Sequence, residues 1–435
     1  PAPVDVPPRE QVPLLQRLVR LVQKSLSLMP PLARWAARQT PIATPGFFRD
    51  HLPALVDVRN RAPVVHDKLT GMYWVSRVAD VAPLLKDPRC SHNPHTATSG
   101  VVARLAKTND PDDTAHSDMF LVDAPHHARL RRPFQRALGR RDPDELRAAI
   151  QSAAIELLDG LGHVPTFDLH AQFATPLAVH VVANLVGLGK IDVPALRQEV
   201  DDIGRLHDPF LQRQGRLAAI AARRALLARC AVLVQSRRQH PTEDLTSRVI
   251  RDSDPTAPLT DQELAINVAR FVVAGVQTTT ALICNTMIAL LQHPEELAKI
   301  RQDPDLAANA VEEALRFLPP FSVLPRLTKE PVTIGGCPIG AGQTVMLGIA
   351  AANREPGFIE DGDRFDISRP AFPHFSFGGG AHLCLGANLA RLEAQIAVQQ
   401  VLGRFPEMKL SAKHPVVWRE QVGMTDLRAL YVDVV

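Results

Sequence analysis

Cysteine is scarce in this sequence, and its spacing excludes two kinds of structural site. Five of the 435 residues are cysteines, at positions 90, 230, 284, 337 and 384. None of them belongs to a Cys-x-x-Cys pair, so neither a zinc site nor a disulfide framework is expected. This cysteine usage is typical of a reducing, intracellular compartment and predicts a cytoplasmic protein.

Excess charge of one sign, charge runs and flexible linkers are also lacking. The chain carries 49 Lys and Arg against 46 Asp and Glu, a net charge of +3. A balance this even gives no indication that nucleic acid is the main partner. Because no Gly/Ser linker or repeat divides the chain, we expect a single domain over residues 1–435, with residues 1–45 as a poorly defined N-terminal extension.

The apolar stretch LLQRLVRLVQKSLSLMPPLARW near the N-terminus is too charged to cross a bilayer. Arg17, Arg20 and Lys24 interrupt it, so we expect neither a signal peptide nor a membrane span. A weakly amphipathic surface helix is the remaining interpretation.

Helical periodicity dominates the rest of the chain, which predicts a mainly α fold with small β-sheets. The expected helices are 144–161, 192–205, 212–239, 261–292, 294–302, 304–318 and 387–403. Strand-like runs are shorter: residues 72–77, a hairpin over 331–348, and the last segment, LRALYVDVV.

The longest predicted helix, 261–292, is apolar on nearly all sides and should therefore run through the centre of the protein. At 1.5 Å per residue it is roughly 48 Å long. A transmembrane span is the competing interpretation, and Asn267, Arg270, Gln277 and Asn285 argue against it.

In the middle of this helix stand Gly275 and three threonines, all poor helix formers. Either something approaches the backbone closely at this point, or Gly275 lets another helix pack close. The sequence leaves both alternatives open.

The stretch HFSFGGGAHLCLGANLAR, residues 374–391, predicts a pocket for a thiolate. A thiolate is a strong, soft metal ligand. The glycines before Cys384 allow a tight turn and close approach to a flat group, and Gly386 lets the backbone bend into helix 387–403. The free N–H groups of that helix would stabilise a negatively charged sulfur, and Phe377 can shield it from water.

The segment FGGGAHLCLG resembles the haem-binding loop of the cytochromes P-450, Phe-x-x-Gly-x-x-x-Cys-x-Gly. The resemblance implies the cytochrome P-450 fold, in which a long central helix lies over the haem. It also implies haem b as cofactor, with Cys384 as the proximal ligand of the iron and with Phe377 and Gly386 in the cofactor site.

Other stretches are similar to the same family, in the same order along the chain. Glu313 and Arg316, in VEEALRF, resemble the buried pair that braces the cysteine loop. The segment 352–369 resembles the loop that precedes the cysteine.

Four basic residues resemble the family's ligands of the haem propionates. His127 and Arg131, four residues apart, lie on one helix face, while Arg326 and His382 correspond to the third and fourth ligands. Taken singly, each of them is also compatible with an ordinary solvated base.

The segment AGVQTT resembles the oxygen-binding groove, which implies catalytic roles for Ala274, Gly275, Gln277 and Thr278. The family usually has an acid before the threonine, and here Gln277 occupies that position. A glutamine holds water but cannot release a proton near neutral pH. Our hypothesis is that a water chain through Thr278 delivers protons while Gln277 positions it; the alternatives are a reaction less dependent on this relay and a substitution without consequence.

The implied activity is that of a monooxygenase, which activates dioxygen with two electrons and hydroxylates an organic substrate. A peroxide-driven peroxygenase, a haem-thiolate isomerase and a non-catalytic haem sensor are the alternatives. We expect the substrate pocket to be formed by a mobile 92–118 loop, a possible lid, and by 203–215, 271–278 and 321–324. Its expected apolar lining suggests a steroid, terpenoid, polyketide or fatty acid; the lining residues are Val272, Val273, Val276, Phe321, Val323 and Leu324.

Electrons must come from a partner, because the sequence contains no flavin or iron–sulfur motif. We expect ferredoxin and ferredoxin reductase, with NAD(P)H as the electron source, and a monomeric enzyme. The basic segment 129–141, with Arg132 and Arg136, is either a docking surface for an acidic ferredoxin or a solvated helix face.

Overall fold

The structure, a computed structural model, describes residues 40–434 except 45, 163, 209 and 210. The surface helix expected in the N-terminal extension lies outside the described residues. The α-helices are α3 Leu52–Arg61, α4 Val78–Leu84, α5 Gly100–Asn109, α6 His126–Gly139, α7 Pro143–Gly160, α8 Thr175–Val186, α9 Val193–Gly204, α10 Arg213–Gln239, α11 Leu245–Asp252, α12 Asp261–Gln292, α13 Pro294–Gln302, α14 Ala307–Phe317, α15 Ile349–Ala352 and α16 Ala387–Arg404. The strands are β1 Val65–Asp67, β2 Met72–Val75, β3 Cys90–Ser91, β4 Thr166–Asp168, β5 Leu324–Thr328, β6 Val332–Ile334, β7 Cys337–Ile339, β8 Thr344–Leu347, β9 Lys409–Leu410, β10 Val417–Trp418, β11 Leu427–Ala429 and β12 Tyr431–Asp433.

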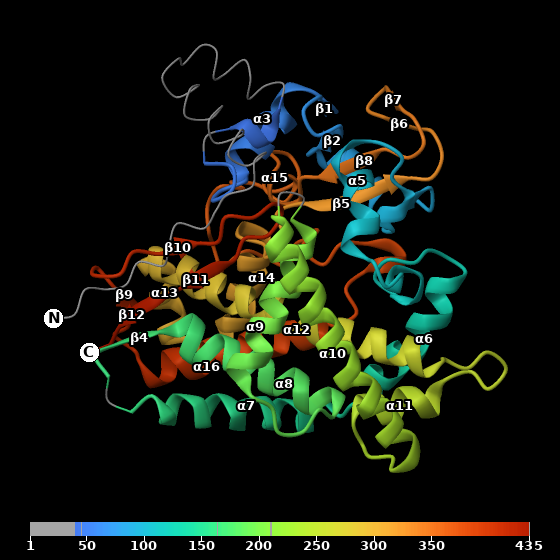
Figure 1. The fold of residues 1–435 in the computed structure, drawn as a ribbon. Coiled ribbons are helices and arrows are strands. Elements are labelled where there is room, and N and C mark those ends of the chain that lie inside the picture. Colours follow the sequence, from blue (N-terminus) through green and yellow to red (C-terminus); the bar gives the residue numbers. More distant parts are fainter. Residues whose placement is uncertain (1–39, 45, 163, 209–210, 435) are drawn as a thin grey trace.

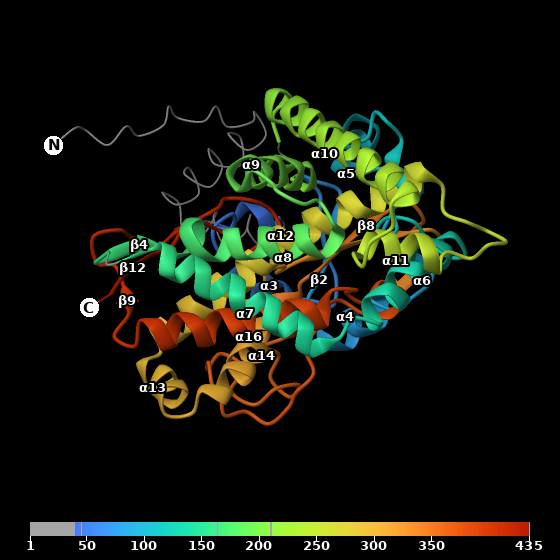
Figure 2. The ribbon, with the colours of Figure 1, turned by 90° about the horizontal axis from the view of Figure 1, so that it is seen from below.

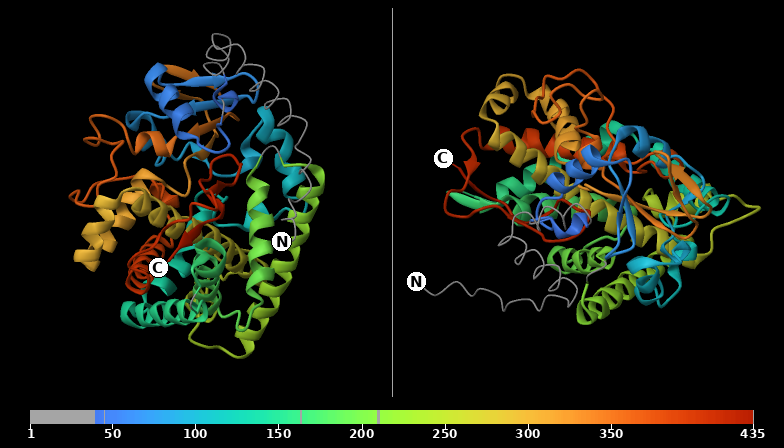
Figure 3. Two further views of the ribbon diagram at one scale, coloured as in Figure 1. Left: turned by 90° about the vertical axis from the view of Figure 1, so that its left-hand side faces the viewer. Right: turned by 90° about the horizontal axis from the view of Figure 1, so that it is seen from above.

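The sheets are small, and the largest lies with α3 at one end of the molecule while helices fill the other (Figures 1 and 3). Its strand order is β1-β2-β8-β5-β3. β2 and β8 pair in parallel, whereas the other neighbours are antiparallel. The predicted class, mainly α with small β-sheets, is confirmed.

Helix α12 is the core of the helical part, as its sequence predicted. Its start is fixed by a capping box, in which Thr260 and Glu263 satisfy each other's backbone N–H groups. Helices α8, α10, α14 and α16 all pack against it, and Figure 2 shows α7 between α8 and α16. By length and composition α12 would pass for a membrane span, but 83% of its most apolar 18-residue window is buried inside the fold.

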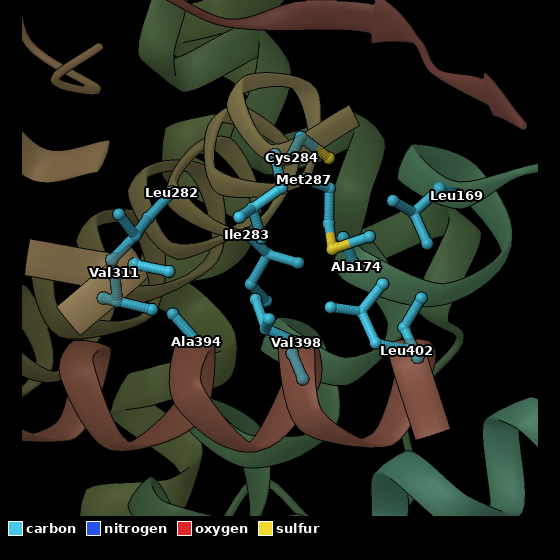
Figure 4. Close-up of a cluster of buried hydrophobic side chains, with 14 of the residues drawn as sticks. Leu169, Ala174, Leu282, Ile283, Cys284, Met287, Val311, Ala394, Val398 and Leu402 are labelled. Carbon is cyan, nitrogen blue, oxygen red and sulfur yellow. The ribbon is translucent and has the colours of Figure 1, made fainter. Parts of the chain in front are cut away.

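The largest hydrophobic cluster lies where α12 meets α16. Figure 4 shows Ile283 of α12 above Val398 of α16, with the sulfur of Met287 beside Ala174. Cys284 is fully buried in the same cluster, where it acts as a small apolar side chain. This packing fixes the position of α16, whose first turn follows directly after Cys384.

Two predictions about the strands were only partly right. Within 331–348, β6 and β7 form the expected hairpin, but β8 separates from it and inserts between β2 and β5. The C-terminal segment forms two strands in different sheets, because β11 pairs with β10 and β12 pairs with β4 and β9. Periodicity within a segment does not determine its partner.

The expected 92–118 loop was wrong in part, because it contains the helix α5. Val101 and Ala106 of α5 are buried, and Thr98 is tied to Gly342 by a backbone hydrogen bond of 2.9 Å. This helix is not evident in the sequence because its apolar repeat covers fewer than three turns.

Candidate active site

The cysteine loop is a tight turn that ends at the first turn of α16. The Cys384 N–H donates to the carbonyl of Phe377 at 2.9 Å. Gly378 and Gly380 adopt positive φ angles of 71° and 67°, which residues other than glycine rarely adopt. The backbone N–H of Gly386, the N-cap of α16, donates to the cysteine sulfur, as expected for a thiolate at a helix N-terminus.

The close approach allowed by two of these glycines is to protein. A Cβ on Gly380 would stand 2.8 Å from the carbonyl oxygen of Leu85, and one on Gly379 would stand 3.2 Å from the Leu85 Cβ. The run of glycines therefore presses the loop against the segment that follows α4. This differs from the sequence-based expectation, in which the glycines approached a flat group.

Cys384 is accessible to solvent, yet the protein atoms around its sulfur withhold enough water from it for burial to raise the pKa of the thiol. The Gly386 N–H and the positive charges of Arg131 and Arg391 act in the opposite direction, since they stabilise the thiolate. The guanidinium of Arg391 also lies over the ring of Phe377, at 4.5 Å from its centroid.

Glu313 and Arg316 form the expected buried pair, and both are fully inaccessible. Arg316 donates to the two carboxylate oxygens of Glu313, at 2.8 Å and 2.7 Å. It also donates to the carbonyls of Gly362 and Arg364, at 2.6 Å and 2.9 Å. Arg369 completes the group with a hydrogen bond of 3.2 Å to Glu313, so the pair holds the 352–369 segment through its backbone.

Arg369 was not predicted from the sequence, where its only signal was its place at the end of this segment. A second set of hydrogen bonds connects the 352–369 segment to the cysteine loop. Asn353 accepts from the N–H of Phe375 at 2.8 Å and donates to Ser376 at 2.9 Å. Ser376 in turn donates to the carbonyl of Leu315, one residue before Arg316, at 2.5 Å.

The four predicted propionate ligands meet at one place, although they come from three separate parts of the chain. The ring centroids of His127 and His382 are 4.1 Å apart, and Arg131 donates to the carbonyl of Leu383. Burial first, and then neighbouring positive charge, lowers the pKa of His382 to about 3.

His92, which the sequence analysis did not single out, belongs to the same group. Its ring stacks on His382 at 3.8 Å. Burial and the charge of Arg326 lower the pKa of His92. Its only sequence signal was its place in the predicted 92–118 loop.

These basic groups fit the haem that the resemblance implies, because they lack anionic partners and the two propionates of haem are anions. The Nε2 atom of His127 is buried without a hydrogen-bond partner among the described residues. The side chain of Arg326 is buried, and its one hydrogen bond to a described residue is to the carbonyl of Pro325, its own neighbour, at 2.8 Å. Burial lowers the pKa of Arg326 to about 10. Carboxylate groups placed here would supply the missing acceptors and the missing negative charge.

On α12, the predicted groove residues point in different directions. Ala274 is exposed in the middle of this core helix, so its surroundings leave it accessible. The Thr278 hydroxyl, one turn further on, donates to the Ala274 carbonyl at 2.6 Å. A Cβ on Gly275 would stand 3.1 Å from Val182 of α8, which fits the helix-packing alternative for this glycine.

Gln277 is buried and faces α9. A Cβ on Gly204, the last residue of α9, would stand 2.4 Å from the Gln277 Oε1 atom. The glutamine side chain therefore occupies space that only a glycine on α9 leaves open.

Three of the six residues expected to form the apolar lining are buried in hydrophobic clusters. These are Val272, Val276 and Val323, with at most 2% exposure. At 100° per residue, Val272 and Val276 point about 160° away from Ala274 and so face the core. Val273 lines a small cavity, and Phe321 and Leu324 are half-buried.

The expected docking residues Arg132 and Arg136 are exposed on one face of α6. Neither forms an ion pair with any residue that the structure describes, whereas Arg129 pairs with Glu263 and Arg140 with Asp252.

Comparison with known proteins agrees with this geometry. A family model described as Cytochrome P450 matches residues 193–427. The biotin biosynthesis cytochrome P450 of Bacillus subtilis (strain 168) is 34% identical over 343 residues, which cover 78% of this chain and 84% of that protein. The vitamin D(3) 25-hydroxylase of Pseudonocardia autotrophica is 35% identical over 380 residues, covering 86% of this chain and 91% of that protein.

A solved structure, P450BioI in complex with hexadec-9Z-enoic acid ligated acyl carrier protein, superposes with a TM-score of 0.81 at 31% identity. The match covers 89% of this chain and 100% of that one. With the family model spanning more than half of the sequence and relatives of this identity along most of it, the chain belongs to the cytochrome P450 family.

Proposed function

We propose that this cytochrome P450 hydroxylates a largely apolar small molecule in the cytoplasm, with dioxygen and two electrons that reach it from a ferredoxin and its NAD(P)H-dependent reductase. The observation that carries the proposal is the environment of Cys384. Its sulfur accepts a hydrogen bond from the N-terminus of α16, belongs to a side chain that is accessible to solvent, and lies beside a group of basic residues that lack anionic partners.

Haem, when bound, supplies the oxygen chemistry, and the chain's residues hold and orient it. In this proposal Cys384 ligates the iron, while Arg131, Arg326, His127 and His382 bind the propionates. The bracing by Glu313, Arg316 and Arg369 keeps the cysteine loop in place before the cofactor enters.

Thr278 is the proposed proton-handling residue on the other side of the site. Its hydroxyl proton is engaged by the Ala274 carbonyl, so its oxygen is left to accept a hydrogen bond from water. In our proposal Gln277, anchored against Gly204, positions that water without supplying a proton itself.

The first experiment is the absorption spectrum of the reduced protein under carbon monoxide, with Cys384→Ser beside the wild type. We expect the red-shifted Soret band of thiolate-ligated haem in the wild type and its loss in the variant. Cys337→Ser is the matched control, because this half-buried cysteine lies in the β6–β7 hairpin. A folded wild type without the band would overturn the proposal.

Gln277→Glu tests the proton pathway. If protons pass along waters that Gln277 only positions, an acid at this position should change the ratio of product formed to NADH consumed. An unchanged ratio and rate would show that Gln277 is not limiting. Product formation with hydrogen peroxide at the rate of the complete electron-transfer system would instead favour the peroxygenase alternative.

The proposed apolar substrate is supported by the relatives and by the mainly apolar surroundings of α12. One relative is named a vitamin D(3) hydroxylase, and another is seen with a fatty acid on a carrier protein. Both are long apolar molecules that carry oxygen at one end.

For the redox partner, we propose docking on the face of α6 that presents Arg132 and Arg136. Changing both to Glu should slow haem reduction by ferredoxin at low salt and have less effect at high salt. The double variant Arg213→Glu/Arg301→Glu changes the same charge at exposed sites on α10 and α13 and serves as the control. Equal rates in the two double variants would exclude this surface.

A further inference from the structure

A small cavity of about 30 Å³ lies where α9, α10, α12 and the 114–118 segment meet. This volume holds one or two water molecules, or a substituent of similar size. Its wall includes Thr114, Asp118, Ile203, Arg223, Arg270 and Val273. Three of the segments from which we expected a substrate pocket therefore meet here.

Arg270 connects this cavity with the active-site face of α12. It precedes Ala274 by four residues and Thr278 by eight, so the three share one face of the helix. Arg270 is thus the polar residue that stands one turn before the exposed Ala274.

Aromatic contacts connect the Arg270 guanidinium to the cysteine loop through two intervening rings. It lies 5.4 Å from the ring centroid of Phe120, whose side chain is 43% exposed. Phe120 makes an edge contact of 6.0 Å with His92, which stacks on His382 of the cysteine loop. This row of rings runs from the haem site to Arg270.

The guanidinium has a donor to spare. Its Nε donates to Asp118 at 2.7 Å, and its Nη2 contacts the same carboxylate oxygen at 2.5 Å. Among the described residues Nη1 has no partner. A purely structural tie to the 114–118 segment would be largely redundant, because Asn267, one turn earlier, already bonds to the backbone of Ser117 and Met119 at 2.8 Å each.

Arg223 of α10 faces the same cavity with unused donors. Its Nε and Nη2 atoms are buried without a hydrogen-bond partner in the described part of the chain. Nη2 lies in ion pairs with Asp110 at 3.2 Å and with Asp112 at 3.8 Å. Neither contact has hydrogen-bond geometry, and Asp110 already accepts from Thr114 and Ala115. Buried donors without acceptors are rare in folded proteins and point to an absent acceptor.

We propose that this cavity is a substrate subsite, in which Arg270 and Arg223 bind an oxygen acceptor, a carboxylate or a carbonyl, at one end of an otherwise apolar substrate. The inference rests on the proposed function and names the substrate class more closely. Because Arg270 stands one turn from Ala274 and two from Thr278, the oxidised carbon lies at least roughly 5 Å from the anchored oxygen. The enzyme therefore oxidises its substrate away from the polar end.

The test uses holoprotein that already shows the carbon monoxide band, so failure of the proposed function is seen before any ligand is added. Sodium dodecanoate and 2-tridecanone are titrated separately, and the spin-state change of the haem gives each Kd. We expect Arg223→Leu to weaken the better ligand at least tenfold, and the double variant Asp118→Asn/Arg270→Leu, which removes both charges together, to do the same.

Arg229→Leu is the matched control, since Arg229 lies on α10 in an ion pair with Glu199 but lines no part of this cavity. We expect its Kd to stay within twofold of the wild type, and all variants to keep their carbon monoxide band and melting temperature. If only dodecanoate binds tightly, the subsite binds a carboxylate. If only the ketone binds tightly, it binds a neutral carbonyl group. Unchanged affinity in the cavity variants, equal weakening in Arg229→Leu, or no spectral response to either ligand would overturn the proposal.

Discussion

Glu393 is a buried acid whose ionisation should make the fold less stable as the pH rises. It lies on α16, nine residues after Cys384, and is 2% exposed. Its Oε1 atom has no hydrogen-bond partner among the described residues. Burial raises the pKa of its carboxyl group from 4.5 to about 8.

The sign and size of the effect follow from this pKa. Between about pH 4.5 and 8 the folded protein keeps a proton on Glu393 that the unfolded chain has released, so stability falls as the pH rises. At about 1.36 kcal/mol per pH unit, the loss is about 1 kcal/mol at pH 5 and approaches about 5 kcal/mol at pH 9. Below pH 4.5 both states hold the proton, and the loss disappears.

Glu393→Gln removes the ionisation and keeps the shape. We expect the variant to differ little from the wild type at pH 5 and to be more stable by roughly 3–5 kcal/mol at pH 9, as measured by urea unfolding followed by far-ultraviolet circular dichroism. Any fixed cost of the amide is equal at both pH values and cancels in the comparison.

Glu156→Gln, at an exposed position on α7, serves as the control and should leave the pH dependence unchanged. If Glu393→Gln and the wild type lose stability in parallel from pH 5 to 9, the carboxyl group is not buried in the way that the structure describes, and the reasoning fails.

Two further predictions concern the support of the cysteine loop. Arg316→Leu leaves Glu313 buried with too little positive charge, and should lower the free energy of unfolding by about 3–5 kcal/mol and remove most of the bound haem. Arg364→Leu, at a side chain 62% exposed, should change neither quantity. Unfolding curves and the haem content per protein measure the two effects. Gly380→Ala places a Cβ 2.8 Å from a backbone oxygen, at a residue with a positive φ, and should lower the haem content several-fold. Gly403→Ala, whose Cβ would meet nothing within 4 Å, should not lower it. Equal haem content in the two variants would contradict the close contact.

The parts that the sequence predicted well are those in which nearby residues set the structure. The bounds of α12 follow from its cap and its apolar composition. The hydrogen bond from Gly386 to the cysteine sulfur follows from the spacing between a loop and the helix that begins after it. In both, residues a few positions apart determine the outcome.

Prediction was weaker where the partner is distant in sequence. That Gly380 presses on Leu85 depends on how the loop lies against α4, about three hundred residues earlier in the chain. For His92 no local pattern existed, because its role depends on stacking with His382. The side on which the valines of α12 lie could not be predicted for another reason: nearly every face of α12 is apolar, so its composition does not say which face is accessible.

The glutamine at position 277 shows how such distant pairing bears on function. Its sequence signal was the absence of the usual acid, which left open whether the change has consequences. In the structure the amide packs against Gly204 at the end of α9, and α9 also contributes Ile203 to the cavity beside Arg270. Gln277 therefore couples the helix that carries Thr278 to the helix that borders the proposed substrate subsite. If the proposed proton pathway is right, an exchange at position 277 should act on both that pathway and the position of α9, so product coupling and substrate affinity should be measured in the same variant.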